Sequence, residues 1–271
     1  MTCEICNFAN PKATVTAIIL KDNKLLVLKR NEEPFKGKWD LAGGYMNEEE
    51  TSEFAMRREL QEELGLTGVS LTLMKMVSGY GFWKDEMFPI LSHFYLVDIG
   101  EQNFTLNTEE NSELKWILLS ELNSNNLAWD SNQEFCSWLK DNFTYDLDRV
   151  RELVKQLDPT AEVKEQSLYK AILCGHVSKI YDGDKLIAMG WIFPRQTLLR
   201  YQAVIEDMIV DETYRGKGYG RIVLQELLKW AKDKNIEVVE LTTGHHREAA
   251  YKLYESEGFT LHDTRHMLKF L

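Results

Sequence analysis

The chain has 271 residues, of which 44% are hydrophobic and 28% charged, a balance typical of a folded globular protein rather than a disordered one. No apolar run reaches the roughly 20 residues that a membrane-spanning helix needs, and the N-terminus lacks the apolar core of a signal peptide. With four cysteines and no export signal, we expect a cytoplasmic protein with free thiols and no membrane partner.

The net charge of −11 falls entirely on the first part of the chain. Residues 1–147 hold 13 basic and 24 acidic side chains, whereas residues 148–271 hold 19 of each. An acidic surface repels nucleic-acid backbones, so we expect no nucleic-acid partner, and it is compatible with a site that holds cations. The uneven charge also indicates two units of different origin, while the oligomeric state stays open.

The first half of the chain alternates strand patterns with loops around one central helix. β-Branched residues predict two strands in ATVTAIILKDNKLLVLKR, joined by a turn at Asp22 and Asn23. The loop GKWDLAGGYMNEEE leads into a helix over about 51–64 that Gly65 ends. Two more strands are predicted in LTLMKMVSGYGFW and FPILSHFYLVDI, and the apolar segment ELKWILLSEL precedes a helix in NQEFCSWLKDNF.

The second half predicts a separate mixed α/β unit. Apolar positions 147, 150, 154 and 157 mark an amphipathic helix, and HVSKIYDGDKLIAMGWIF predicts a hairpin that turns at residues 182–184. The strand YQAVIEDMIV, the helix GYGRIVLQELLKWAKDKN, the strand IEVVELT, the helix REAAYKLYESEG and short closing strands follow. No linker composition marks the boundary, which we place between residues 145 and 146.

Three glutamates of the first helix carry the strongest chemical signal. Glu59, Glu62 and Glu63 lie within one turn, on a narrow arc opposite apolar residues that include Phe54. Like charges at this spacing cost about 0.2–0.5 kcal/mol per pair on an exposed helix. A bound cation would offset the repulsion, and a solvated acidic helix face is the alternative.

The wider spacing distinguishes these two interpretations. Five residues separate Gly44 from Glu50, and seven more lead to RELQEELGL, which begins at Arg58. This pattern resembles the Nudix box of the Nudix hydrolases at every defined position. The resemblance implies an α/β/α sandwich with a mixed sheet over residues 1–145. Such a domain hydrolyses a nucleoside diphosphate linked to another group, with Mg²⁺ or Mn²⁺ as cofactor.

The same resemblance implies a role for each residue of the box. The principal metal ligands would be Glu59, Glu62 and Glu63. Of these, Glu62 is also a predicted catalytic residue. Arg58 would hold a carboxylate in place, and Glu50 would support the loop. Gly43 and Gly44 let the backbone bend into the start of the helix.

The nucleotide substrate and a zinc site at the N-terminus stay open. Cys3 and Cys6 form a single C-x-x-C pair, whereas a structural zinc site takes four ligands, so we expect a knuckle without metal. The segment SGYGFWKDEMFP matches neither the NADH-cleaving nor the coenzyme A-cleaving members of the family. The segment contains the aromatic residues Tyr80, Phe82 and Trp83. Two interpretations of them are equally open: they stack on a nucleobase, or they pack within the protein.

A second chemical signal lies in VDETYRGKGYGRIVLQELL. Glycines between a strand and a helix let backbone N–H groups converge on an anion. The loop resembles the R-x-x-G-x-G motif of the GNAT acetyltransferases, and HHREAAYKLYESEGF resembles their next motif. The resemblance implies a mixed α/β GNAT fold over residues 146–271 that transfers an acetyl group from acetyl-CoA to an amine. The implied acetyl-CoA contacts are Met208, Ile209, Val210, Arg215, Gly216, Lys217, Gly218, Tyr219 and Gly220.

The resemblance also places the acetyl-transfer residues. Tyr254 corresponds to the tyrosine that often protonates the departing thiolate. Glu206 or Asp207 would receive the amine proton through water, although a structural role for Glu206 is an equal alternative. Strand alternation predicts Glu206 on the same face as Met208. Arg247 stands where many members of the family have Asn.

Two hypotheses follow. In the first, the chain is a bifunctional enzyme that hydrolyses a nucleotide-type substrate and acetylates an amine. In the alternative, a GNAT-like module binds acetyl-CoA without turnover and regulates the Nudix hydrolase. Release of free thiol in the presence of a set of amines separates the two.

Overall fold

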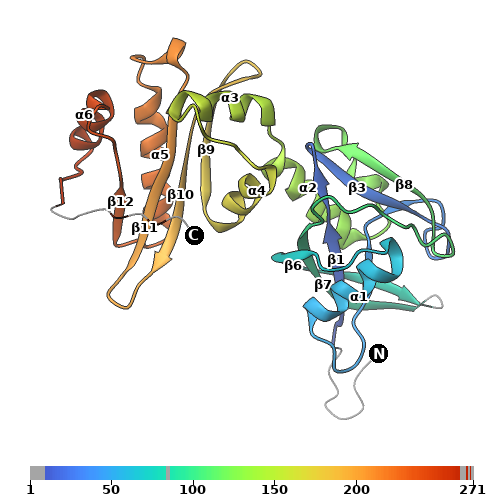
Figure 1. Cartoon of the computed structure of the whole chain (residues 1–271). Helices are drawn as coiled ribbons and strands as arrows, with labels where there is room; N and C mark the ends of the chain where they lie inside the picture. Colours follow the sequence, from blue (N-terminus) through green and yellow to red (C-terminus); the bar gives the residue numbers. More distant parts are fainter. Residues whose placement is uncertain (1–9, 84–85, 263–266, 268, 270–271) are drawn as a thin grey trace. The chain divides into compact units, whose positions relative to one another are not determined.

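The computed structural model describes residues 10–83, 86–262, 267 and 269 (Figure 1). None of the helices in this part of the chain is long and apolar enough to cross a membrane. The chain divides into two compact units, residues 1–147 and 148–271, so the division lies two residues beyond the boundary proposed from the sequence. Cys3 and Cys6 lie outside the described residues, as do most of the residues expected to form closing strands.

The first unit contains two four-stranded sheets. The first sheet has the order β5-β1-β7-β6, with β1 parallel to β7 and antiparallel to β5. In the second sheet β3 pairs with β2, β4 and β8, all antiparallel. The strands are β1 (Lys12–Ile18), β2 (Leu20–Lys21), β3 (Lys24–Arg30), β4 (Trp39–Asp40), β5 (Gly43–Tyr45), β6 (Ser70–Trp83), β7 (Glu86–Asp98) and β8 (Asn111–Leu118).

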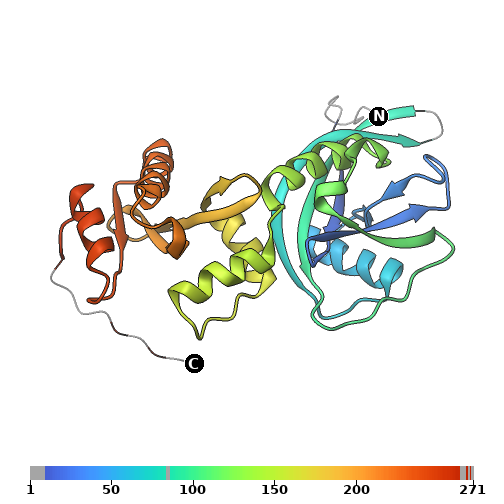
Figure 2. The same ribbon diagram turned by 90° about the horizontal axis from the view of Figure 1, so that it is seen from above.

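Helices α1 (Ser52–Leu64) and α2 (Asp130–Phe143) cover opposite faces of the first sheet (Figure 2). Two consecutive residues of β7 show why, since neighbours on a strand point to opposite faces. The Phe94 ring stacks on Phe135 of α2 with centroids 4.0 Å apart. The Tyr95 hydroxyl hydrogen-bonds Ser52 Oγ at the start of α1, at 2.6 Å. The predicted α/β/α sandwich with a mixed sheet is confirmed.

Helix α1 begins and ends where the sequence predicts. Thr51 caps it by accepting a hydrogen bond from the Phe54 N–H at 3.2 Å, and Gly65 ends it with φ of 66°, a left-handed conformation that suits glycine. The predicted apolar arc is wrong in one member. Phe54 is 62% exposed, while Leu60 and Leu64 are fully buried.

The second unit is built on one sheet of order β12-β11-β10-β9, with β11 and β12 parallel and the other pairs antiparallel. Helix α5 packs against β9, β10 and β11, so the mixed α/β prediction is confirmed. Helix α4 was not predicted from the sequence, although Leu168 and Ile172, and likewise Tyr169 and Leu173, stand at the i,i+4 spacing of an amphipathic helix. The elements are α3 (Leu147–Leu157), α4 (Glu165–Cys174), β9 (His176–Asp182), β10 (Lys185–Gln196), β11 (Tyr201–Val210), η3 (Glu212–Tyr214), α5 (Tyr219–Asp233), β12 (Val238–Leu241) and α6 (Glu248–Ser256).

A β-bulge in β11 corrects the predicted strand alternation. Glu206 opposes Trp191 and Ile209 opposes Met189, so two residues of β11 lie across from Gly190 alone. The extra residue is Asp207, whose φ is +51°. A bulge interrupts the regular alternation of side chains, so the expectation that Glu206 and Met208 share one face of a regular strand does not hold.

Candidate functional sites

The acidic site of the first unit is formed by buried carboxylates on α1. Glu59 and Glu63 are only 8% and 7% exposed, whereas the side chain of Glu62 is 53% exposed. Charged groups are rarely buried without a compensating partner. The alternative of a solvated acidic face therefore fails for two of the three glutamates.

Burial raises the pKa of both carboxyl groups, that of Glu63 well above its usual range. The negative charges of Glu59 and Asp40 raise the pKa of Glu63 further. Within the described chain, Glu63 Oε2 is buried and accepts no hydrogen bond. An unpaired buried carboxylate oxygen is costly, and a bound cation would satisfy it.

Arg58 organises the loop and the glutamates around it. Its guanidinium donates to both carboxylate oxygens of Glu50, at 2.8 and 3.0 Å, to Glu59 Oε1 at 2.7 Å and to Glu62 Oε2 at 2.9 Å. The bonds from Arg58 to Glu50, together with the bond from the Asn47 N–H, lower the pKa of Glu50 to about 2. Glu50 thereby joins the loop at Asn47 to α1.

Two adjacent glycines let the loop approach α1 closely, each for its own reason. Gly43 has φ of +145°, and a Cβ there would lie 2.1 Å from Val15 O. A Cβ on Gly44 would lie 2.5 Å from Glu59 Oε1. Of the two glycines expected to provide the bend, Gly43 has the positive φ, and Gly44 leaves room for the Glu59 carboxylate.

The three glutamates fit a hard divalent cation if the Glu62 side chain moves away from Arg58. Among the described residues no three His, Cys, Asp or Glu side chains converge as a ready metal site. Glu59 and Glu63 supply buried oxygens of the type that Mg²⁺ and Mn²⁺ prefer, while Glu62 is paired with Arg58. An exposed i,i+4 ion pair is worth only about 0.3–0.5 kcal/mol, so Glu62 can leave Arg58 at little cost.

Gly44→Ala should weaken divalent-metal binding with little effect on folding. The added methyl group would displace the Glu59 carboxylate, which is the mobile end of a side chain. Disturbing the support of a metal ligand typically costs about 10–100-fold in affinity. Titration with Mn²⁺ followed by electron paramagnetic resonance measures the change, and thermal unfolding serves as the folding control. Wild-type Mn²⁺ affinity in the variant would contradict this role of Gly44.

Asp40 belongs to the acidic site, although it is not part of the motif that predicted the site. Its carboxylate is buried and accepts four hydrogen bonds, from Leu41 N, Arg30 Nη1, Trp129 Nε1 and Asn132 Nδ2, at 2.8 to 3.0 Å. The only sequence signal is an aspartate between Trp39 and an apolar run. Two of its donors, Trp129 and Asn132, lie 89 and 92 positions away, which no local pattern reveals.

Aromatic side chains form a cluster in the same unit. Phe35 meets Trp129 edge-on, with ring centroids 5.0 Å apart, and also Phe82, with centroids 6.0 Å apart. Phe82 is 38% exposed and Tyr80 51% exposed. Phe82 thus packs on a neighbour and also faces solvent, so both interpretations offered for these aromatic residues remain open.

The second unit contains a cleft of about 960 Å³. Gln156 and Leu157 of α3, the residues of the β11 bulge, the glycine loop and the first turns of α6 line it. Apart from Lys217, whose ammonium group lies 4.9 Å from the centroid of the Tyr214 ring, all predicted acetyl-CoA contacts lie on this cleft. These lining residues are Met208, Ile209, Val210, Arg215, Gly216, Gly218, Tyr219 and Gly220.

The glycine loop presents backbone groups suited to an anion. Gly216 and Gly218 have φ of +76° and +89°, and Gly218 is the N-cap of α5. The N–H groups of Arg221 and Ile222 bond back to Gly218 O, and the N–H groups before them have no carbonyl within the helix to bond. Free N–H groups at a helix N-terminus stabilise phosphate groups.

Tyr254 lies on the same cleft as the glycine loop. Burial raises its pKa, partly offset by the positive charge of Arg247, so the phenol keeps its proton at neutral pH. Its hydroxyl group contacts Met208 Sδ at 3.8 Å, and a thioether is only a weak acceptor. Glu206 also lines the cleft, and Arg247 donates to Leu157 O at 3.0 Å. The structure thus brings both predicted acetyl-transfer residues, Tyr254 and Glu206, to one cleft.

Two family models match the chain in succession. The NUDIX domain matches residues 10–139, and the acetyltransferase (GNAT) family matches residues 132–259. The two matches overlap only at residues 132–139.

Individual proteins resemble one part of the chain or the other. ADP-ribose pyrophosphatase of Methanocaldococcus jannaschii is 36% identical over 92 residues, 34% of this chain and 53% of that protein. CTP pyrophosphohydrolase of Escherichia coli is 30% identical over 103 residues, 38% of this chain and 72% of that protein. The uncharacterized N-acetyltransferase YobR of Bacillus subtilis is 31% identical over 87 residues, 32% of this chain and 34% of that protein. The chain thus spans about half the length of the first of these relatives and a third of YobR.

Proposed function

Because the chain belongs to the NUDIX family through residues 10–139 and to the GNAT acetyltransferase family through residues 132–259, we propose that it is a bifunctional enzyme. One site hydrolyses a nucleoside diphosphate linked to another group, with Mg²⁺ or Mn²⁺. The other transfers an acetyl group from acetyl-CoA to an amine. The observation that supports the hydrolase most directly is the buried pair Glu59 and Glu63, with one oxygen lacking a hydrogen-bond partner among the described residues.

In the hydrolase reaction, water attacks one phosphorus atom and a P–O bond of the diphosphate breaks. Glu59, Glu62 and Glu63 would hold the divalent cation, which supplies charge neutralisation and an acidified water when bound. Arg58 and Glu50 keep the loop and the carboxylates in register through the bonds described above. The raised pKa of the buried glutamates fits this role, because a cation stabilises their ionised form.

In the acetyl transfer, the amine nitrogen attacks the thioester carbonyl carbon and the C–S bond breaks. The loop from Arg215 to Gly220 would bind the pyrophosphate of acetyl-CoA through its N–H groups. Tyr254 would donate its proton to the departing thiolate, which its raised pKa permits at neutral pH. Glu206 would take the proton lost by the amine through a water molecule.

A hydrolysis screen tests the first half of this proposal. The purified full chain with Mg²⁺ is offered ADP-ribose, CTP, other nucleoside triphosphates, dinucleotides and nucleotide sugars, and nucleoside monophosphate is measured. We expect release from at least one class that EDTA abolishes. The absence of release from every class, with Mg²⁺ or Mn²⁺, would contradict the hydrolase assignment.

A further inference from the structure

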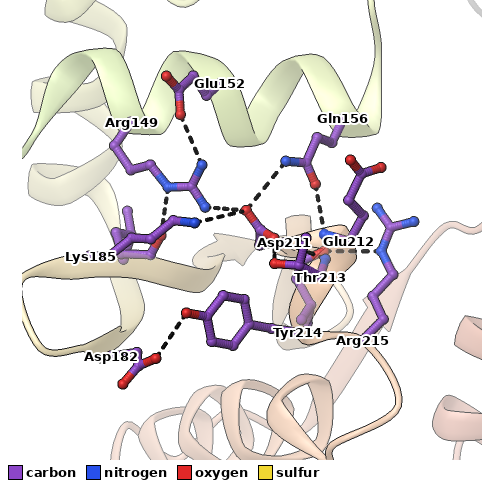
Figure 3. A network of polar contacts seen from close by, with 12 residues as sticks. Arg149, Glu152, Gln156, Asp182, Lys185, Asp211, Glu212, Thr213, Tyr214 and Arg215 are labelled. Atoms are coloured by element: carbon purple, nitrogen blue, oxygen red, sulfur yellow. Dashed lines mark hydrogen bonds and ion pairs between the residues drawn. The ribbon is translucent and has the colours of Figure 1, made fainter.

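A buried ion pair fixes the start of the loop that precedes α5 (Figure 3). Asp211, the first residue after β11, is 3% exposed, and Arg149 of α3 is 8% exposed. Arg149 Nη2 donates to Asp211 Oδ2, and Arg149 Nε donates to Leu186 O of β10 at 2.8 Å. The guanidinium therefore joins helix α3 to the sheet and to the beginning of the loop.

The second carboxylate oxygen of Asp211 shapes the next residues. Asp211 Oδ1 accepts from the Thr213 N–H at 3.0 Å and from Thr213 Oγ1 at 2.6 Å, which caps η3. The donors on Thr213 and Arg149 hold the pKa of Asp211 well below its usual range. The carboxylate is thus ionised throughout the neutral pH range and keeps all of these bonds.

Gln156 in the last turn of α3 adds a second connection (Figure 3). Its Oε1 accepts from the Glu212 N–H at 2.9 Å, and its Nε2 lies 3.5 Å from Asp211 Oδ2. Tyr214 is fixed separately, since its hydroxyl group donates to Asp182 Oδ2 at 2.8 Å. The segment 211–214 is therefore tied to α3, β9 and β10, and Gln156 itself lines the cleft.

The loop beyond this segment is held mainly from its two ends. Arg215 Nε donates to Val210 O at 3.1 Å, but a Cβ on Gly216 or Gly218 would meet nothing within 4 Å. Trans peptides fix the distance between consecutive Cα atoms, so a displacement of residues 211–214 passes directly to the N–H groups that follow. The anchor thus decides where these groups lie.

We propose that Asp211, Arg149 and Gln156 are positioning residues that set the N–H groups of the glycine loop for the pyrophosphate of acetyl-CoA. This inference rests on the proposed acetyl-CoA binding. The three residues act through the loop, which lies remote from the reacting carbonyl. Loss of a contact that ground state and transition state share raises KM and leaves kcat nearly unchanged.

The test uses the full chain with Asp211→Asn and Gln156→Leu. Calorimetric titration with acetyl-CoA should give a dissociation constant at least roughly tenfold above wild type, since small misplacements of binding groups carry large costs. With a fixed amine acceptor, KM for acetyl-CoA should rise in the same proportion while kcat changes little. Acetyl-pantetheine is an acetyl donor that lacks the pyrophosphate, so with this donor the variants should have the same kcat/KM as the wild-type enzyme. If the three residues had only a structural role, the variants would lose activity equally with acetyl-CoA and with acetyl-pantetheine.

Asp148→Asn is the matched control. It makes the same chemical change on the same helix, at a side chain that is 89% exposed and pairs with Arg151, and it should bind acetyl-CoA as wild type does. If Asp211→Asn fails to fold because Arg149 loses its partner, Gln156→Leu decides, since it keeps the ion pair. Wild-type affinity for acetyl-CoA in the folded variants would overturn the inference. Absence of acetyl-CoA binding to the wild-type chain would instead overturn the proposed transferase, and the inference with it.

Discussion

Glu63→Gln should remove most of the hydrolase activity while the protein stays folded. The substitution keeps the shape of the side chain but deletes a buried carboxylate that would hold the cation. A catalytic metal contributes several kcal/mol, and each 1.4 kcal/mol is a factor of ten, so we expect a loss of at least about 10²-fold. Glu62→Gln should also reduce turnover, because Glu62 is the third proposed ligand. Initial rates at saturating Mg²⁺ measure both effects.

The exposed Glu53 in the first turn of the same helix provides the matched control. Glu53→Gln makes an identical chemical change away from the buried pair, and its rate should equal that of wild type. Wild-type turnover in Glu63→Gln at saturating Mg²⁺ would show that the metal assignment is wrong.

The raised pKa of Glu63 also predicts how stability without metal depends on pH. A carboxyl group with a folded-state pKa above its unfolded value of 4.5 binds more protons when folded. Its contribution to stability is full below pH 4.5 and is lost as pH rises through the folded-state pKa. In EDTA, Glu63→Gln should therefore unfold at a higher temperature than wild type at neutral pH, and the difference should shrink as pH falls toward 4.5. Calorimetric unfolding curves at several pH values test this.

Tyr254→Phe should slow acetyl transfer by about 10²–10⁴-fold, the usual contribution of a positioned general acid. The change keeps the ring, which packs edge-on against Phe259 with centroids 6.0 Å apart, and removes only the hydroxyl group. Acetyl-CoA affinity should barely change, because the proposed pyrophosphate contacts come from the backbone of residues 215–220. Calorimetry gives the affinity, and thiol release with an amine acceptor gives the rate.

Tyr251 lies on the same helix, is 40% exposed and serves as the control. Tyr251→Phe deletes an equivalent hydroxyl group and should leave acetyl transfer unchanged. If Tyr254→Phe acetylates at the wild-type rate, Tyr254 is not the acid.

Features that rest on neighbouring residues were predictable from the sequence. The ends of α1 follow from Thr51 and Gly65, which act within a turn of themselves. The turns at Asp22 and Asn23 and at Gly183 follow from residues that tolerate positive φ. The close spacing of the glutamates likewise places their side chains on one helix without reference to the rest of the fold.

Features that depend on distant residues were not predictable in this way. Burial of Glu59 and Glu63 requires the loop at Gly44 to close over α1. The bonds from Trp129 and Asn132 to Asp40 span 89 and 92 positions, and the ion pair between Arg149 and Asp211 spans 62. The bulge at residue 207 depends on the register with β10, so alternation along β11 alone gives the wrong face.

The most direct test of two independent active sites in one chain is to measure both rates in parallel on Glu63→Gln and Tyr254→Phe. We expect Glu63→Gln to lose hydrolysis and keep acetyl transfer, and Tyr254→Phe to show the opposite pattern. Loss of hydrolysis in folded Tyr254→Phe protein, or failure of the wild-type chain to release thiol with any amine, would contradict this account. Those results would instead favour a GNAT-like module that regulates the hydrolase.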